Sequence, residues 1–218
     1  MNSYEVSEPI ISNRIVVYKT DKRLIEFTDK LNASLTDNFA EMHGHCNDNG
    51  KTYSNIGIRL YDYSKGTGKN TVKVNVNVAP EDIYWIYATL NQGKKEFSLE
   101  QTKIFGSTDI QGFAGMTKLR IVRSETDQNG QKRKYQWCIS AENGKGVPCK
   151  TAIGGTYCKS GTYKTVTKAF ISISDYDFFK LICRVARYIQ QFENAYCPSI
   201  IRQGHKAFED MLMAKKYA

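Results

Sequence analysis

The sequence predicts an α+β fold in which two antiparallel β-meanders, each closed by a helix, form curved sheets with helices on one face. Residues 56–60 and 72–78 alternate apolar and polar side chains, which is the period of a half-buried strand. Residues 174–193 place apolar side chains every three or four positions, which is the period of an amphipathic helix. A shift of 95 residues aligns the strand-to-helix junction near residue 80 with that near residue 175, as expected for an internal repeat.

The first half of the chain opens with a predicted strand over 14–19, which is rich in β-branched and aromatic residues. Large apolar residues then recur every three or four positions from Leu24 to Met42, so we expect a helix there, followed by a loop over 43–55. The strands at 56–61 and 72–78 form a hairpin around the turn at 65–70. Pro80 is predicted to occupy the first position of the following helix.

The second half contains strands predicted at 95–105, 117–124, 132–141 and 164–173, with the turn 127–130 joining the middle pair. Ser174, with Asp177 three residues later, is a variant of the capping box and is expected to begin a helix that ends near residue 193. A last amphipathic helix is expected over 203–216, after Pro198. Tyr135 and Trp137 share the parity of Ile139, which predicts core positions for both.

These elements predict a single domain over 1–218, with pseudo-repeats at 50–92 and 94–193 and a C-terminal helical extension at 199–218. In the aligned repeat, Val76, Val78 and Ile83 correspond to Ile171, Ile173 and Phe178. The alternative is that any strand followed by a helix shows this pattern.

Several classes of protein are disfavoured by the sequence. Its apolar runs are only a few residues long, far short of the roughly 18 that a spanning helix needs, so no membrane partner is expected. The first residues lack the basic-then-apolar order of a signal peptide, and the six cysteines never form Cys-x-x-Cys, so we expect a cytoplasmic protein.

No motif demands catalysis, a cofactor or a metal. Gly66 to Lys69 resembles the end of a phosphate-binding loop but lacks its first glycine and its final serine or threonine. His43, His45 and Cys46 offer three zinc ligands without a fourth nearby, and a polar loop is the simpler interpretation. We therefore expect no enzymatic activity, no cofactor and no metal site.

Positive charge is concentrated in one part of the chain. The net charge is +9, and residues 118–168 hold eleven basic against three acidic residues. Such segregation indicates a polyanionic partner, with nucleic acid the first choice. A basic surface that serves only solubility is the alternative. A membrane surface is disfavoured because the basic residues alternate along strands and do not form an amphipathic helix.

The strand faces opposite the helices combine cations with aromatic residues. This composition is typical of surfaces that bind single strands, because cations contact phosphates while aromatic rings stack on unpaired bases. Residues 155–164 contain Gly-Thr-Tyr twice and are expected to form a flexible hairpin, which is either able to fold over a bound strand or an ordinary surface hairpin. The predicted nucleic-acid-binding residues are Arg59, Tyr61, Tyr63, Lys73, Lys118, Arg120, Lys134, Tyr157, Lys159, Tyr163, Lys164, Lys168 and Phe170.

Over residues 56–193 the predicted order of strands and helices resembles the Whirly, Pur-alpha and transcriptional-coactivator group of single-stranded nucleic-acid-binding proteins. The resemblance implies sequence-tolerant binding of single-stranded DNA or RNA and a homo-oligomer. A homo-oligomer is also expected because a meander with one helix layer leaves sheet edges and apolar helix surface to cover. The alternative function is a nuclease or other enzyme subunit of a replication, repair or conjugation machine.

Overall fold

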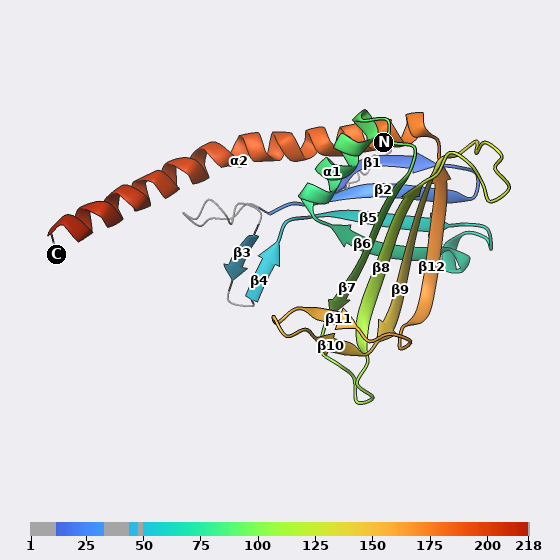
Figure 1. Ribbon diagram of the computed structural model, residues 1–218, viewed down its shortest axis with the longest axis horizontal. Helices are drawn as coiled ribbons and strands as arrows, with labels where there is room; N and C mark the ends of the chain where they lie inside the picture. Colours follow the sequence, from blue (N-terminus) through green and yellow to red (C-terminus); the bar gives the residue numbers. More distant parts are fainter. Residues whose placement is uncertain (1–11, 33–43, 48–49, 218) are drawn as a thin grey trace, which may run out of the picture.

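Two four-stranded antiparallel sheets, each followed in the chain by a helix, form the α+β fold of the computed structural model, which describes residues 12–32, 44–47 and 50–217 (Figure 1). The first sheet has the order β1-β2-β5-β6 and is followed by α1; its elements are β1 (Arg14–Lys19), β2 (Arg23–Lys30), β5 (Asn55–Asp62), β6 (Val72–Val78) and α1 (Pro80–Asn91). The second sheet has the order β12-β9-β8-β7 and is followed by α2; its elements are β7 (Phe97–Phe105), β8 (Ala114–Arg123), β9 (Trp137–Gly146), β12 (Lys164–Ile173) and α2 (Asp175–Tyr217).

Three short elements complete the part of the fold that the structure describes. They are the hairpin of β3 (Gly44–Asn47) and β4 (Gly50–Tyr53), the hairpin of β10 (Pro148–Lys150) and β11 (Thr156–Cys158), and the 3-10 turn Gly68–Asn70. Within the described residues, no helix combines the length and the apolar character needed to cross a membrane.

One hydrophobic core is shared by both sheets and both helices. The strands of the two sheets cross steeply (Figure 1). Their inward side chains belong to one buried cluster that also includes residues of α1 and α2. The register places Ile58 beside Val76 in the first sheet and Ile139 beside Ile121 in the second, and all four are buried. Because side chains alternate along a strand, burying one face leaves the other face of each sheet to polar and charged residues.

The predicted repeat matches the architecture, since each sheet passes directly into a helix. The aligned positions occupy the core in both halves; they are Val76, Val78 and Ile83 in the first and Ile171, Ile173 and Phe178 in the second. The third residue of each helix is an aspartate. Asp82 Oδ2 accepts a hydrogen bond from the Ala79 N–H at 2.9 Å, and the Asp177 N–H donates to Ser174 Oγ at 3.1 Å.

The helix predicted from Leu24 onward is wrong over its first part, which is strand β2. Its side chains follow a two-residue period, with Ile25 and Phe27 in the core and Glu26 on the opposite face. The first unit therefore has four strands and begins at Arg14, ahead of the predicted start of the repeat at residue 50. The remaining positions of the predicted helix, 33–42, lie outside the described residues. The loop predicted over 43–55 contains β3 and β4.

Two predictions in the second half also need correction. A single helix, α2, runs through Pro198 and replaces the two helices predicted on either side of it. A proline inside a helix removes one hydrogen bond and crowds the carbonyl four residues earlier, yet α2 continues past Pro198. Strand β9 begins at Trp137 and not at residue 132, so Tyr135 lies in the connecting loop and is 42% exposed, whereas Trp137 is 1% exposed as predicted.

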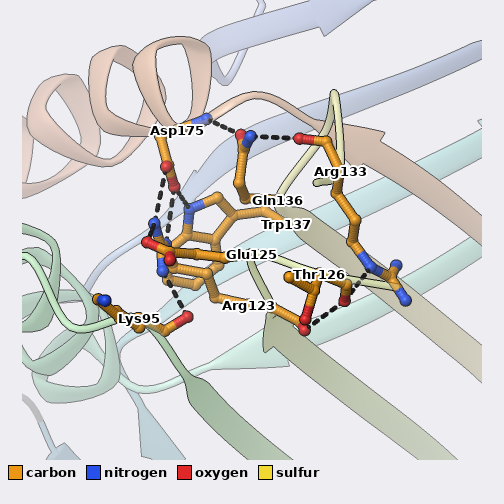
Figure 2. Close-up of polar contacts among 9 residues, drawn as sticks. Lys95, Arg123, Glu125, Thr126, Arg133, Gln136, Trp137 and Asp175 are labelled. Atoms are coloured by element: carbon orange, nitrogen blue, oxygen red, sulfur yellow. Dashed lines mark hydrogen bonds and ion pairs between the residues drawn. The ribbon is translucent and has the colours of Figure 1, made fainter. Parts of the chain in front are cut away.

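A polar junction fixes the start of α2 to the end of the second sheet (Figure 2). The Arg123 guanidinium donates two hydrogen bonds to the Asp175 carboxylate, each 2.8 Å long, and the Trp137 Nε1–H donates a third at 2.7 Å. The Asp175 N–H donates to Gln136 Oε1 at 3.1 Å, and Arg123 also contacts the Lys95 carbonyl. Four segments of chain are therefore joined at one carboxylate and one guanidinium.

The Asp175 junction makes stability depend on pH. The hydrogen bonds from Arg123 hold the pKa of Asp175 below its ordinary value. Its contribution is therefore complete above the unfolded pKa of about 4 and disappears as the pH falls through the lower folded pKa. We expect Asp175→Asn to cost about 1 kcal/mol at neutral pH, because the carboxylate is partly exposed, and we expect that difference to shrink below about pH 4. Urea denaturation at several pH values measures it.

Asp210→Asn, on the distal part of α2, is the matched control and should leave the unfolding free energy unchanged at each pH. A destabilisation by Asp175→Asn that stays constant down to acidic pH would contradict the ion-pair explanation.

Truncating one aromatic residue on each face of the second sheet tests which face is inside. Trp137→Leu should lower the free energy of unfolding by roughly 2–4 kcal/mol, because it leaves a cavity in the core. Phe170→Leu, at a position that is 37% exposed, should cost less than about 1 kcal/mol. Equal losses in chemical denaturation would show that the faces are wrongly assigned.

Candidate nucleic-acid interface

The outward face of the second sheet brings together three of the predicted cations. The strand register places Lys118, Glu142 and Lys168 in one row across β8, β9 and β12. Arg120 and Phe170 lie in the next row, on either side of Ser140. Because neighbouring strands are about 4.8 Å apart, each row crosses roughly 10 Å of surface from β8 to β12. The alternation predicted for these positions is therefore present.

Carboxylates pair with two of these cations. Lys168 Nζ is 2.7 Å from Glu142 Oε1, and Arg120 Nε is 2.6 Å from Glu100 Oε1. Burial opposes ionisation of Glu142, but hydrogen bonds from Lys168 and Thr165 outweigh it, so the pKa of Glu142 lies below its ordinary value. Both cations remain more than half exposed, and such surface pairs are weak. A phosphate can therefore compete for them.

The segment that carries Tyr163 already packs on this sheet, in contrast to the flexible hairpin that the sequence predicts. A Cβ atom at Gly144 would lie 2.4 Å from the Lys164 carbonyl oxygen and 2.7 Å from the Tyr163 ring, so the close approach requires glycine. Lys118 Nζ lies 3.7 Å from the centre of the Tyr163 ring. Burial, and then the charge of Glu142, raise the pKa of Tyr163, which keeps the phenol neutral. Tyr157 and Lys159 remain exposed.

Two predicted cations leave the outward face. A bulge between Thr165 and Thr167 interrupts the alternation of β12, so Lys164 pairs with Lys145 and loses the parity of Lys168. Its ammonium lies 5.0 Å from the Phe113 ring. Lys134 lies in the loop between β8 and β9, where its ammonium is 5.5 Å from the Tyr135 ring.

The outward face of the first sheet contains a buried carboxylate. Glu26 is 2% exposed, and its two oxygens accept hydrogen bonds from Arg14 at 2.8 Å and from Arg59 at 3.1 Å. Tyr61 donates to the same carboxylate at 3.3 Å. A buried charge needs such partners, so Arg59 and Arg14 neutralise Glu26 before any ligand binds. Arg59 is consequently the least available of the predicted cations.

Tyr61 and Tyr63 form a pair of parallel rings beside this carboxylate. Their planes differ by 8° and their centres are 6.3 Å apart, while Lys73 Nζ lies 5.9 Å from the Tyr61 ring. Burial, followed by the charge and the hydrogen bond of Glu26, raises the pKa of Tyr61, so the ring stays uncharged. This group combines flat aromatic surface with a cation that no carboxylate of the described residues engages in an ion pair.

Phe170, on the outward face of the second sheet, contacts the first sheet through Arg23. The Arg23 guanidinium of β2 stacks on its ring, with Cζ 3.6 Å from the ring centre. Arg23 also contacts Asp62 at 3.2 Å, and Asp62 lies between Tyr61 and Tyr63 in the sequence. Arg23 and Asp62 share the parity of the buried Ile25 and Leu60, so this contact joins Phe170 to the end of the first sheet and not to the face that carries Tyr61.

A second basic surface was missed by the sequence analysis. A groove of about 380 Å³ runs between β1 and α2, with apolar residues on one side and Lys180, Arg184 and Arg187 on the other. Lys180 pairs with Asp177 at 2.7 Å. The sequence does contain a pattern that predicts this surface. The three cations are four and three residues apart, and these spacings place them on one side of a helix.

The described residues contain no group of three or more His, Cys, Asp or Glu side chains arranged to hold a metal ion. His43, which the sequence analysis grouped with His45 and Cys46, lies outside the described residues. No protein-family model, curated protein or solved structure matches this chain.

Proposed function

We propose that this protein binds single-stranded DNA or RNA with little sequence preference. The observation that carries the proposal is the pairing of aromatic rings with cations on the outward sheet faces and at their edges. Three such pairs include a ring on an outward face or packed against one, and the distances from cation to ring centre range from 3.6 to 5.9 Å: Arg23 with Phe170, Lys73 with Tyr61, and Lys118 with Tyr163. Two further pairs, Lys134 with Tyr135 and Lys164 with Phe113, lie off these faces.

Each pair offers complementary chemistry to one nucleotide. When an unpaired base displaces the cation that covers the ring, stacking contributes roughly 1–3 kcal/mol, and the displaced cation is free to neutralise a phosphate. In a duplex the base faces are stacked on one another and are not available to the rings. The arrangement therefore favours single strands, and the stacking is tolerant of sequence because every base has an aromatic face.

The carboxylates on these faces strengthen the preference for single strands. Glu26, Glu100 and Glu142 each neutralise a nearby cation, which weakens the purely electrostatic attraction that a duplex would share. Stacking then provides a larger part of the binding free energy.

Oligothymidine should bind at least about tenfold more tightly than a duplex of equal length, because a loss of even one stacked base costs a factor of that order. Fluorescence anisotropy at several salt concentrations measures both affinities. The affinity should fall as salt rises, because each phosphate contact releases counterions. Equal or tighter binding of the duplex would refute the proposal. Cleavage of the labelled strand on adding Mg²⁺ or Mn²⁺ would favour the alternative of a nuclease.

Substitutions should separate stacking from charge. Phe170→Leu should weaken the binding of oligothymidine by roughly 1–3 kcal/mol without changing its salt dependence, because apolar area remains and only the ring is lost. Lys118→Ala should weaken binding and reduce the slope of log affinity against log salt by about 0.7, the value for one phosphate on a single strand.

Lys206→Ala, on the distal part of α2, removes the same charge away from the sheets and serves as the control. Glu142→Gln should tighten binding several-fold, because it releases Lys168 and removes one repulsive charge. A loss of affinity on Glu142→Gln in a variant of unchanged stability would contradict a role for Lys168 in phosphate binding.

A further inference from the structure

Strand β1 has a free edge, which faces helix α2 across a groove. β1 is the outermost strand of the first sheet, and among the described residues only β2 pairs with it. The Thr20 N–H donates to the Arg23 carbonyl at 2.8 Å, so the alternation of an antiparallel ladder turns the backbone groups of Tyr18 toward β2. The N–H and C=O groups of Val17 and Lys19 therefore point away from β2, toward the open edge.

Helix α2 runs beside β1 in the opposite direction (Figure 1). Near the start of the helix, Asp177 lies close enough to Tyr18 that its charge, after burial, helps to raise the pKa of the phenol. Further along the helix, the Tyr188 hydroxyl donates to Asp29 at 2.9 Å, and the Asp29 N–H donates to the Asn13 carbonyl at the start of β1. Between these two points the helix and the strand each extend about 17 Å, so the groove follows the whole edge of β1.

The wall of the groove that α2 provides is positively charged. Lys180, Arg184 and Arg187 lie along it, and all three are exposed. Asp177 pairs with Lys180, but within the described residues neither Arg184 nor Arg187 forms an ion pair. Lys180 and Arg184 are about 6 Å apart along the helix axis, close to the roughly 6.7 Å between alternate residues of a strand. We call the space between β1 and these three cations the β1–α2 groove.

We propose that the β1–α2 groove binds an acidic peptide in extended form, which adds to the first sheet as a further strand antiparallel to β1. Main-chain hydrogen bonds to Val17 and Lys19 provide affinity, as is general for strand addition to a sheet edge. The antiparallel orientation continues the pattern of the sheet, in which every paired strand is antiparallel to its neighbour.

The two sides of the added strand face different surroundings. Val17 is paired with Glu26, shares its outward direction and is 39% exposed, so an apolar residue fits opposite it. The neighbouring residues of the peptide point to the inward side, where α2 packs through Ile182 and Val185 and presents Arg184 beside the groove. Carboxylates suit these positions. The peptide is therefore expected to alternate acidic and apolar residues.

Two other occupants complement the groove less well. A second copy of β1 would bring its own Arg14 and Lys19 to a basic groove, and charged residues on an edge strand oppose such pairing. A nucleic-acid strand would neutralise the cations, but its phosphates offer no hydrogen-bond donor to the carbonyls of Val17 and Lys19. An acidic peptide supplies main-chain donors, main-chain acceptors and carboxylates together. The proposal does not depend on the proposed function.

Fluorescence anisotropy of the full chain with a labelled peptide tests the charge complementarity. The probe Gly-Ser-Glu-Val-Glu-Val-Glu-Ser-Gly should bind saturably, and the same peptide with lysine in place of each glutamate should not bind. Arg184→Glu combined with Arg187→Glu should weaken binding at least about tenfold, because charge-assisted contacts become repulsive. Lys206→Glu combined with Lys215→Glu reverses the same charge on the distal part of α2 and should leave the affinity unchanged. No binding of the probe, or equal affinity of the two double variants, would overturn the proposal.

The peptide backbone tests strand addition directly. N-methylation of both valines of the probe removes the donors expected to face Val17 and Lys19 and should abolish binding, whereas N-methylation of the central glutamate alters an amide that faces away and should be tolerated. In NMR hydrogen exchange, the Val17 and Lys19 amides should exchange at least about tenfold more slowly with saturating probe, because they gain an acceptor. The Tyr18 amide, which already faces β2, should change much less. Binding without this added protection would overturn the added strand.

Oligothymidine separates this proposal from the proposed function. The variant with Arg184→Glu and Arg187→Glu should bind oligothymidine as tightly as the control variant with Lys206→Glu and Lys215→Glu. Loss of oligothymidine binding with retained binding of the acidic probe would assign the groove to nucleic acid and overturn the peptide proposal. If the unmodified chain binds the acidic probe and no oligothymidine, the peptide proposal stands and the proposed function fails.

Discussion

The burial of one face of both sheets in a shared core is the constraint on which the rest of the structure depends. Side chains alternate along a strand, so the inward residues Ile121, Ile139 and Ile171 determine that Arg120, Ser140 and Phe170 point outward. A slip of one residue in the register would carry charged groups into the core and is therefore strongly disfavoured. The outward residues are released from packing and can carry function.

The outward faces are less positive than the composition suggests, because carboxylates lie among the cations. Glu26 is buried between two arginines, and Glu142 lies between Lys118 and Lys168 in its row. Such carboxylates hold long basic side chains beside the aromatic rings and reduce the net field. A surface of this kind relies more on ring stacking than on charge, which agrees with a single-stranded ligand better than with a duplex.

Helix α2 leads away from the second sheet over 43 residues. It begins at the junction of Arg123 with Asp175, which fixes it to the ends of β8 and β9, and it ends well beyond the sheets (Figure 1). The helix is continuous through Pro198, so its distal part has a defined direction relative to the outward faces of the sheets.

The sequence by itself determined the elements whose signals are local. The alternation at 72–78 and at 164–173 predicted β6 and β12, and Ser174 with Asp177 predicted the start of α2. Only the tertiary structure decided that residues 23–30 are a strand, because the spacing of Leu24 and Phe27 suits a helix until β2 is paired between β1 and β5. Two further features could not be predicted from the sequence: the bulge that turns Lys164 away from the outward face, and the pairing of Glu26 with Arg59, which is 33 residues away. Such contacts depend on register between distant strands, and a local period contains no information about register.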